Sequence, residues 1–143
     1  MIITGKYQFI PDIYFLLGTL LSDYAPLVYD LAICPIPLAP RRKKWRGFNQ
    51  SEILSHSISE QRKQLYAELL IRSKNTKTQK DLSKPDRLKN LQSAFMVDFL
   101  EPIPKRIVLI DDVTTTGTTF IEATKALKKA GAQVVWCIAI AQD

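Results

Sequence analysis

Residues 107–119 constrain the fold of this chain more than any other segment. They are Ile-Val-Leu-Ile-Asp-Asp-Val-Thr-Thr-Thr-Gly-Thr-Thr. The aliphatic run at 107–110 predicts a buried strand, and the hydroxyl residues around Gly117 predict a loop that leads into a helix. The carboxylates of Asp111 and Asp112 stand where that strand ends. Open α/β sheets bind ligands outside the carboxyl ends of their strands, so this segment predicts both a fold class and the position of a site.

The chemistry of this segment favours a phosphorylated sugar. Backbone N–H groups of the loop and of the following helix N-terminus can hold a phosphate. The adjacent carboxylates would repel a phosphate, and they suit sugar hydroxyls or a divalent cation such as Mg²⁺. A Walker A loop, which requires a Gly-Lys-Ser/Thr ending, is excluded, and the alternative is a buried strand with an Asp-Asp turn and a Thr helix cap. The candidate phosphate-loop residues are Val113, Thr114, Thr115, Thr116, Gly117, Thr118 and Thr119.

The other apolar segments alternate between strand and helix patterns. Strands are predicted at 31–34, 69–71, 94–97, 107–110 and 134–140, and helices at 12–24, 51–65 and 119–130, the last capped by Gly131. In the helix at 51–65, one side is expected to carry Ile53, Leu54, Ile58, Gln61 and Leu65. This alternation, in a chain of 143 residues, predicts a single α/β domain whose mainly parallel sheet of about five strands is flanked by helices.

The chain carries an excess of positive charge, with a formal net charge of +6 and a pI near 9.4. Much of the excess is local, in the basic cluster Arg41, Arg42, Lys43, Lys44 and Arg46. Such a cluster favours an anionic partner, either a phosphorylated ligand or nucleic acid. Trp45 and Phe48 lie among these cations and suit stacking on single-stranded bases, although packing of Phe48 under the next helix fits equally well.

The cysteines and the apolar segments indicate a cytoplasmic protein. Cys34 and Cys137 lie in strand-like stretches and form neither a CxxC pair nor a zinc knuckle. We expect both to be buried free thiols in a reducing cytoplasm. The N-terminus lacks the pattern of a signal peptide, and the apolar run at 13–21 is too short to span a bilayer, so we expect no membrane segment.

Two segments resemble known families. The run at 107–119 resembles the signature with which type I phosphoribosyltransferases bind 5-phosphoribosyl-1-pyrophosphate (PRPP). Residues 46–52, Arg-Gly-Phe-Asn-Gln-Ser-Glu, resemble the RGFNQ motif of the ComF family of competence-associated, phosphoribosyltransferase-like proteins. Further matches to the ComF pattern are Arg72, Thr76, Gln79, Leu82, Arg87, Asn90, Ala94 and Phe95. The resemblance covers residues 28–141, and this sequence lacks the four-cysteine zinc module with which ComF chains typically begin.

The resemblance implies a type I phosphoribosyltransferase fold and an enzyme that transfers a phosphoribosyl group from Mg²⁺–PRPP to an acceptor, with release of pyrophosphate. It implies that Asp111 and Asp112 bind the ribose 2′- and 3′-hydroxyls and help to position Mg²⁺, while the loop at 113–119 binds the 5′-phosphate. The implied pyrophosphate loop consists of Ile36, Pro37 and Leu38, with Arg46 close by. Residues 1–27 are expected to form a partial helical hood, and 73–92 a flexible loop that closes over PRPP. The residues assigned to this flexible loop are Arg72, Gln79 and Arg87.

The sequence leaves several assignments open. Asn49, followed by Glu52, fits a helix cap with a capping box better than a ligand contact, and His56 fits a solvated helix surface. The apolar run at 14–17 suits either the core or a homodimer interface. The alternative to a pyrophosphate loop after Pro35 is a structural turn, stiffened by proline, with a solvated basic face. The competing function is a non-catalytic DNA-uptake factor that binds single-stranded DNA or a protein partner, because a fold alone does not establish catalysis.

Overall fold

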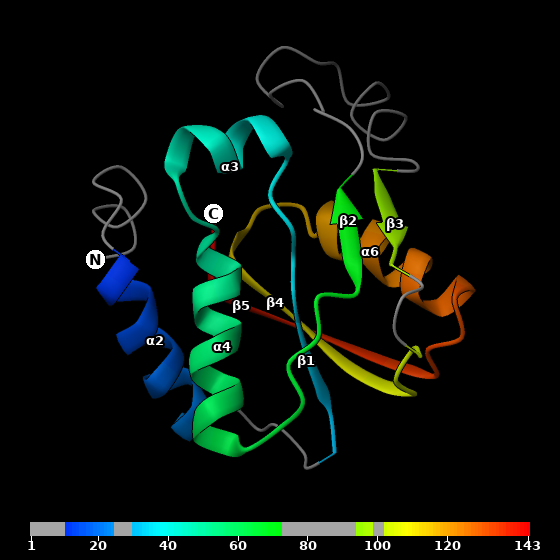
Figure 1. Cartoon of the computed structure of the whole chain (residues 1–143), viewed down its shortest axis with the longest axis horizontal. Helices are drawn as coiled ribbons and strands as arrows, with labels where there is room; N and C mark the ends of the chain where they lie inside the picture. The colour runs from blue at the N-terminus through cyan, green and yellow to red at the C-terminus, as the bar shows by residue number, and fades with distance from the viewer. Residues whose placement is uncertain (1–10, 25–29, 73–93, 99–101) are drawn as a thin grey trace.

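The computed structural model describes residues 11–24, 30–72, 94–98 and 102–143. Their elements are, in chain order (Figure 1), α2 (Pro11–Tyr24), β1 (Ala32–Pro35), α3 (Pro40–Arg46), α4 (Gln50–Arg62), β2 (Leu70–Arg72), β3 (Phe95–Val97), β4 (Arg106–Thr114), α6 (Thr118–Lys129) and β5 (Val134–Gln142). The whole of the flexible loop predicted at 73–92, with Gln79 and Arg87, lies outside the described residues, as do parts of the predicted hood.

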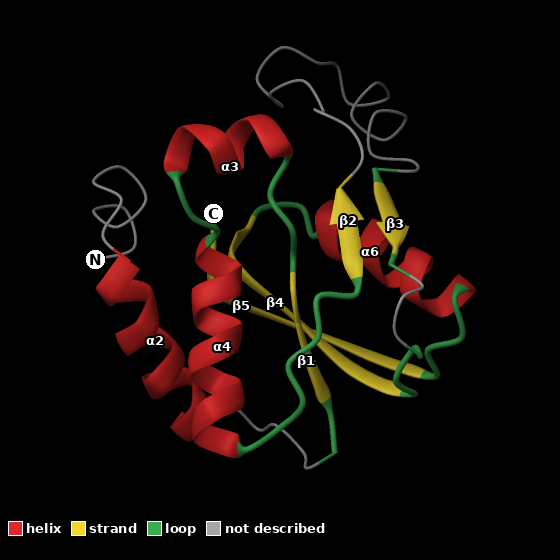
Figure 2. Cartoon of the chain, in the orientation of Figure 1, coloured by secondary structure: helices red, strands yellow, loops and turns green. Residues whose placement is uncertain are grey.

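The main sheet has three parallel strands in the order β1-β4-β5. Cys34 pairs with Leu109, and Leu109 pairs with Cys137, so the carboxyl ends of the three strands lie at one edge. β2 and β3 form a separate antiparallel pair (Figure 2). The free edge of β1 is taken by residues 65–67, since the Ile33 N–H donates to the Leu65 carbonyl at 2.7 Å. The predicted α/β class with parallel strands is confirmed, while the five expected strands divide between two sheets.

The central strand β4 places its side chains in two separate cores. Ile107 and Leu109 pack toward α6 and the β2–β3 pair, whereas Val108 and Ile110 pack toward α2 and α4. These four side chains are fully buried. Burial on both faces explains why the strand is a continuous aliphatic run instead of an alternating one.

The helices α2 and α4, which lie side by side in Figure 1, pack closely through small residues. A Cβ atom added to Gly18 would lie 2.7 Å from the Ser57 Cβ, and the hydroxyls of Thr19 and Ser57 are 3.1 Å apart. This close approach buries polar side chains that lie outside the apolar face of α4 expected from the sequence. The buried serines of α4 are Ser51, Ser55, Ser57 and Ser59.

The helix predicted at 51–65 is too long. α4 ends at Arg62, and Lys63 follows in a left-handed conformation with φ of 51°. Leu65, predicted on the apolar side, therefore lies beyond the helix and is exposed, and Gln61, also predicted there, is exposed within the last turn. The apolar spacing continues past Arg62 in the sequence, but the chain turns there to pair beside β1.

The strand predicted at 107–110 is too short. β4 runs on to Thr114, because Asp111, Val113 and Thr114 continue to pair with β5. The acidic pair therefore lies inside the strand, and the predicted loop at 113–119 shrinks to residues 115–117.

The predicted cap of α6 is confirmed. Gly131 has φ of 116°, its N–H donates to the Lys128 carbonyl, and the Ala132 N–H donates to the Leu127 carbonyl. This is the Schellman pattern of helix termination. Phe120, Ala123 and Leu127 are buried on one face of α6.

The helix α3 has no counterpart in the sequence prediction. Its signals are Pro40 in the first turn and Gly47 at the C-cap with φ of 81°, the usual asymmetry of Pro at the start and Gly at the end. No residue of α3 is buried, so the segment shows no apolar periodicity from which a helix could be predicted.

Exposure corrects one expectation about the cysteines and divides the apolar run that the sequence left open. Cys34 is buried, but Cys137 is exposed, because β5 is the outer strand of its sheet. In the apolar run at 14–17, Tyr14 is buried while Phe15 and Leu16 are about half exposed. Within the described residues, no helix has the length and apolar character needed to cross a membrane.

Candidate functional site

The carboxyl ends of β1 and β4 meet at one edge of the main sheet. Pro35 pairs with Ile110, and the Ile36 N–H donates to the Ile110 carbonyl at 2.9 Å. The loop after β1 therefore borders the acidic pair and the turn that follows in β4. This is the edge at which the sequence predicts a ligand site.

Asp111 is fixed through one carboxylate oxygen. Its Oδ1 accepts hydrogen bonds from the Ser51 hydroxyl at 2.8 Å and from the Asp112 N–H at 2.9 Å. Burial, and then the neighbouring Asp112 carboxylate, raise the pKa of Asp111 to about 7. The charged form of Asp111 is thus costly in the unliganded site, and a cation or a hydroxyl donor would stabilise it.

Asp112 has an oxygen that no described residue satisfies. Side chains alternate along a strand, so Asp112 lies on the α2–α4 side of β4. Its charge there influences the hydroxyl of Tyr14, which belongs to the core on that side. Its Oδ1 accepts the Val113 N–H at 2.8 Å. Its Oδ2 is buried and has no hydrogen-bond partner among the described residues. Because an unpaired buried acceptor is expensive, this oxygen indicates a place for a ligand atom or an enclosed solvent molecule.

The turn between β4 and α6 presents backbone amides at a helix start. Gly117 forms the N-cap of α6 with φ of 71°, and an added Cβ would meet no atom within 4 Å, so the backbone conformation alone calls for glycine. The described residues provide no side-chain N-cap for α6. The turn borders an open hollow of about 410 Å³ that Phe120 and the end of β5 also line. An anion placed there would meet the positive end of the helix dipole.

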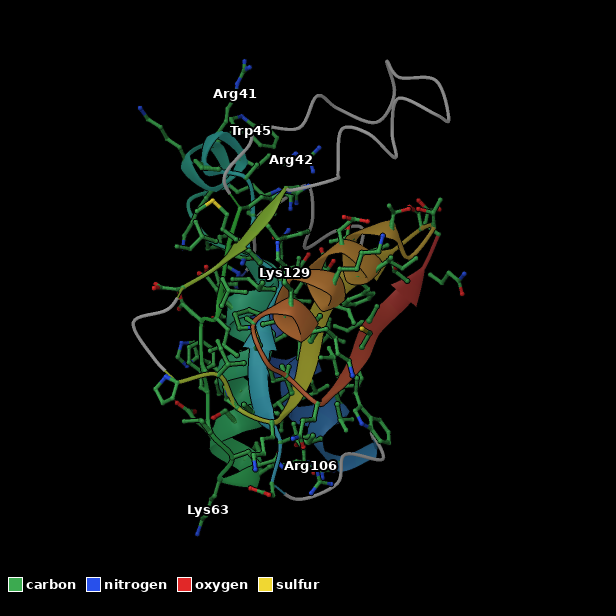
Figure 3. All side chains as sticks on the ribbon, turned by 90° about the vertical axis from the view of Figure 1, so that its right-hand side faces the viewer. Arg41, Arg42, Trp45, Lys63, Arg106 and Lys129 are labelled. Atoms are coloured by element: carbon green, nitrogen blue, oxygen red, sulfur yellow. The ribbon has the colours of Figure 1, made fainter. Side chains whose placement is uncertain are left out.

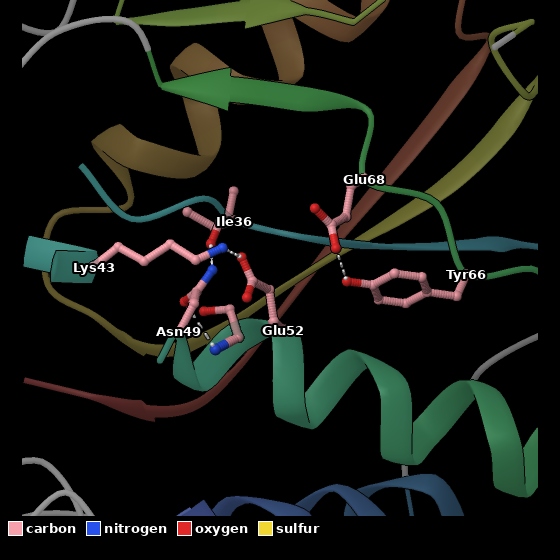
Figure 4. A network of polar contacts seen from close by, with 7 residues as sticks. Ile36, Lys43, Asn49, Glu52, Tyr66 and Glu68 are labelled. Carbon is pink, nitrogen blue, oxygen red and sulfur yellow. Dashed lines mark hydrogen bonds and ion pairs between the residues drawn. The ribbon is translucent and has the colours of Figure 1, made fainter. Parts of the chain in front are cut away.

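The loop after β1 offers few amide donors. Pro35 and Pro37 have no N–H, and the Ile36 N–H is already bonded to β4. The Ile36 carbonyl accepts from Asn49 Nδ2 at 3.0 Å (Figure 4). Of the three residues predicted to form a pyrophosphate loop, Leu38 keeps an N–H that no described group engages.

Asn49 both caps α4 and secures this loop. Its side chain accepts the Ser51 N–H at 3.2 Å, which confirms the predicted helix cap. The predicted capping box is wrong for Glu52, whose carboxylate lies 2.7 Å from Lys43 Nζ (Figure 4). The ion pair ties α3 to the first turn of α4.

The basic cluster lies on α3, close to the same edge of the sheet. Arg41, Arg42 and Trp45 project from this helix at the end of the molecule opposite Arg106 (Figure 3), and Trp45 is 72% exposed. Arg46 ends the helix and is half-buried.

Arg72 approaches the acidic pair from the other side. It ends β2, and its guanidinium carbon lies 5.4 Å from the centre of the Phe95 ring. Burial, and then Arg42, lower the pKa of Arg72, while Asp111 opposes this shift. The structure thus brings Arg72 into the electrostatic environment of Asp111.

Three polar residues belong to this site although sequence reasoning did not select them. Ser51 donates to Asp111, and the Tyr14 hydroxyl lies near Asp112 and beside the Gln50 amide. Burial, and then Asp112, raise the pKa of Tyr14. Ser51 and Gln50 could have been found from their place in the RGFNQSE motif, whereas Tyr14 gave no signal within its apolar run. His56 is exposed, as expected, and stacks on Tyr66 away from the acids.

The donor set suits a magnesium ion that arrives with its ligand. Among the residues that the structure describes, no three His, Cys, Asp or Glu side chains gather to bind a metal. Mg²⁺ commonly uses one or two carboxylates, water and the phosphates of a substrate. The acidic pair, with the unpaired Asp112 Oδ2, matches that mode of binding and does not form a cage of its own.

Comparison with known proteins agrees with this arrangement. Residues 27–143 match the family described as "Phosphoribosyl transferase domain". The chain is 40% identical over 113 residues to Competence protein F of Haemophilus influenzae, a match that covers 76% of this chain and 49% of that protein. It is 39% identical over 110 residues to the DNA utilization protein YhgH of Escherichia coli K12, covering 74% of this chain and 48% of that protein. The ComF resemblance is confirmed, and the chain spans about half the length of these relatives.

A solved structure shares the fold. Glutamine PRPP amidotransferase from Bacillus subtilis, complexed with ADP and GMP, superposes with a TM-score of 0.59 at 20% identity, over 88% of this chain and 25% of that chain. At this level of identity the similarity concerns the fold alone. The predicted phosphoribosyltransferase-like fold is therefore confirmed by sequence and by structure.

Proposed function

Because the chain belongs to the phosphoribosyl transferase domain family, we propose that it binds Mg²⁺–PRPP and transfers the phosphoribosyl group to an acceptor with release of pyrophosphate. The unpaired oxygen of Asp112 carries the proposal. It lies on the same strand that leads to the open helix start at Gly117. A sugar phosphate can bind to the Asp112 oxygen and to the helix start together, since its hydroxyls suit the carboxylates and its phosphate suits the helix amides.

In this proposal each part of PRPP meets a different element. The 5′-phosphate occupies the turn at 115–119 and the N-terminus of α6, and the ribose hydroxyls meet Asp111 and Asp112. Arg46 and Arg72 supply positive charge for the pyrophosphate. Side-chain cations are needed there because the loop of Ile36, Pro37 and Leu38 offers few amides.

Catalysis by these residues rests on position and charge. During transfer the bond between ribose C1 and the pyrophosphate oxygen breaks, a bond from C1 to the acceptor forms, and positive charge develops on the ring. Ionised Asp111 and Asp112 would stabilise that charge from fixed positions, and the phosphate contacts would hold the ring in place for attack. A bound Mg²⁺ would supply charge neutralisation for the departing pyrophosphate.

The test is calorimetric titration with PRPP in the presence of Mg²⁺. We expect binding in the parent protein, and its loss in the double variant Asp111→Asn, Asp112→Asn. Asp30→Asn is the matched control, because Asp30 is exposed and lies at the amino end of β1 beside Arg106. A parent protein that gives no heat with Mg²⁺–PRPP would overturn the proposal. Where binding is found, pyrophosphate release with a panel of bases, amines and nucleotides tests catalysis and identifies the acceptor.

A second candidate function is a non-catalytic factor that binds single-stranded DNA. The observation in its favour is α3, in which Arg41, Arg42, Lys44 and Trp45 are exposed on one short helix. Cations beside an exposed aromatic ring suit a phosphate backbone and stacked bases. The relatives' names, competence protein and DNA utilization protein, agree with this function. Either function would be exercised in the cytoplasm, in keeping with two cysteines that are free.

Fluorescence anisotropy with a labelled single-stranded oligonucleotide tests the second function. The variant Arg41→Ala, Arg42→Ala, Lys44→Ala should weaken binding strongly, whereas Lys125→Ala, Lys128→Ala, Lys129→Ala on α6 removes the same charge from another surface and should weaken it less. DNA binding that survives the double Asn variant but falls with the α3 variant would favour the DNA function. Equal losses from both triple variants would indicate attraction by net charge alone.

A further inference from the structure

Four buried polar atoms without hydrogen-bond partners belong to Tyr14 and to three residues that interact with it. Among the described residues these are the Tyr14 hydroxyl, Arg46 Nε, Gln50 Nε2 and Asp112 Oδ2. The Tyr14 hydroxyl connects them, because it interacts with the charges of Asp112 and Arg46 and lies beside the Gln50 amide without reaching hydrogen-bond geometry. Their convergence at one place is informative, since unsatisfied buried groups are uncommon in folded proteins.

The four residues come from four elements that meet beside the acidic pair. Tyr14 is the fourth residue of α2 and is 0% exposed, and Gln50 opens α4 and is 1% exposed. Arg46 ends α3, and Asp112 lies in β4. Tyr14 is held in place against Phe48, with ring centroids 6.2 Å apart. The cluster is therefore a built feature of the fold and not a chance arrangement of surface side chains.

The chemistry of the four atoms selects a neutral hydroxyl group. Arg46 Nε and Gln50 Nε2 donate, Asp112 Oδ2 accepts, and the Tyr14 hydroxyl can do either. A small anion would be repelled by Asp112, and a small cation by Arg46. A hydroxyl donates one hydrogen bond and accepts others, so it can satisfy the carboxylate and the N–H groups at the same time.

We propose that Tyr14, Gln50 and Arg46 line a subsite that, together with Asp112, binds a hydroxyl of the sugar and thereby selects ribose over deoxyribose phosphates. The inference rests on the proposed function, from which it takes the sugar at Asp112. Arg46 is the half-buried member of the set and ends a short exposed helix. A sugar hydroxyl would enter on the Arg46 side of the set, where Arg46 Nε donates to it.

The subsite makes a prediction about discrimination that a structural role does not. Calorimetry would compare ribose 5-phosphate with its 2-deoxy and 3-deoxy analogues. Because hydrogen bonds to charged groups are among the stronger ones, the parent protein should bind ribose 5-phosphate about tenfold or more tightly than the analogue that lacks the hydroxyl held at Asp112. Tyr14→Phe and Gln50→Met should each reduce this preference several-fold, chiefly by weakening ribose 5-phosphate.

Tyr66→Phe is the matched control. Tyr66 is also a partly enclosed tyrosine, but its hydroxyl donates to Glu68 at 2.7 Å (Figure 4), outside the cluster. This variant should keep the parent's preference. Circular dichroism would confirm that each variant folds, and Gln50→Met alone carries the test if Tyr14→Phe does not fold.

The outcomes separate the subsite from the proposed function. If the parent binds PRPP and discriminates between the sugars, but both variants keep its ratio, the subsite is overturned and the proposed function stands. If both variants weaken all the sugars equally, Tyr14 and Gln50 are structural, and the subsite is again overturned. A parent that binds neither PRPP nor ribose 5-phosphate overturns the proposed function and the subsite with it.

Discussion

The segments that follow β1 and β4 at the site differ in how their backbone polar groups are used. After β1, the chain passes through Pro35 and Pro37, and the polar groups of Ile36 are used by β4 and by Asn49. After β4, the turn at 115–117 depends on the left-handed Gly117, which has no side chain to cap α6, and the described side chains engage only the Thr118 N–H there, through a long bond of 3.4 Å to Thr116 Oγ1. The first end is rigid and poor in donors, whereas the second is a set of backbone donors.

Under the proposed function, this difference assigns the two phosphate groups of PRPP to different strand ends. The 5′-phosphate stays on the sugar throughout transfer, and fixed backbone amides suit a group that does not leave. Pyrophosphate departs, and the charged side chains of Arg46 and Arg72 suit a group that is bound and then released. Under the proposed function, the rigid loop after β1 positions the cations, and the turn after β4 positions the sugar.

The largest expected effect concerns Asp111 in β4, the strand that leads to the donor-rich turn. The pKa of Asp111 is raised to about 7 in the folded protein, above an unfolded value of about 3.9. The native state therefore binds the proton more tightly, and the free energy of unfolding should fall as the pH rises from about 4 to about 7 and then level off. Asp111→Asn should abolish this decline and exceed the parent's stability at pH 8 by an amount on the order of a few kcal/mol.

Urea denaturation of the unliganded proteins at pH 5 and pH 8 would measure this effect. Asp30→Asn serves as the control, because Asp30 is almost fully exposed. If Asp111→Asn and the parent lose stability in parallel between the two pH values, the charge of Asp111 is not costly in the folded protein and β4 does not hold the raised pKa assigned to it.

The next effect concerns the rigid end of β1. Asn49→Ala removes both the cap of α4 and the hydrogen bond to the Ile36 carbonyl, and it should lower the free energy of unfolding by about 2–3 kcal/mol. Asn49→Ser keeps a capping oxygen but cannot reach Ile36, so it should recover about 1 kcal/mol. Chemical denaturation measures both values. Equal stabilities of the two variants would show that the cap contributes nothing and that the link to the loop carries the whole effect.

Two glycines allow a matched test of backbone geometry. Gly117 and Gly47 both have positive φ and open space around an added Cβ, so alanine should cost about 1 kcal/mol of stability at either position. Only Gly117 lies at the helix start assigned to phosphate. Gly117→Ala should therefore weaken PRPP binding by about tenfold, while Gly47→Ala leaves it nearly unchanged. Similar losses of affinity in both would remove the distinction between the two strand ends.

Much of the fold could be predicted because its signals are local. The aliphatic run at 107–110, the spacing of Phe120, Ala123 and Leu127, and the cap at Gly131 each follow from neighbours in sequence, and the structure contains all three. The errors arise where tertiary contacts decide. β4 is longer than its aliphatic run because β5 continues to pair with it, and α4 buries serines because α2 approaches so closely.

The site was only partly predictable for the same reason. Asp111, Asp112 and Gly117 are recognisable as a contiguous pattern, and the structure places them on one strand and its turn. Tyr14 reaches Asp112 from a segment almost a hundred residues away in sequence. No local pattern distinguishes such a tyrosine from a core residue, since its hydroxyl acquires a role only when α2 packs against α4.

The smallest expected effect tests whether α3 is held by its charges. Lys43 and Glu52 are 2.7 Å apart, but the Lys43 side chain is 50% exposed, so the pair should contribute at most about 0.5–1 kcal/mol. A double-mutant cycle with Lys43→Ala and Glu52→Ala measures this coupling, and the coupling should vanish at about 1 M salt. The pair Lys125–Glu122 on α6 is the control, because α6 is anchored by buried apolar side chains. A weak coupling would leave α3 able to move with its cations when pyrophosphate is released. A coupling above about 2 kcal/mol would make α3 as rigid as the loop before it, and the two strand ends would then not differ in the way proposed.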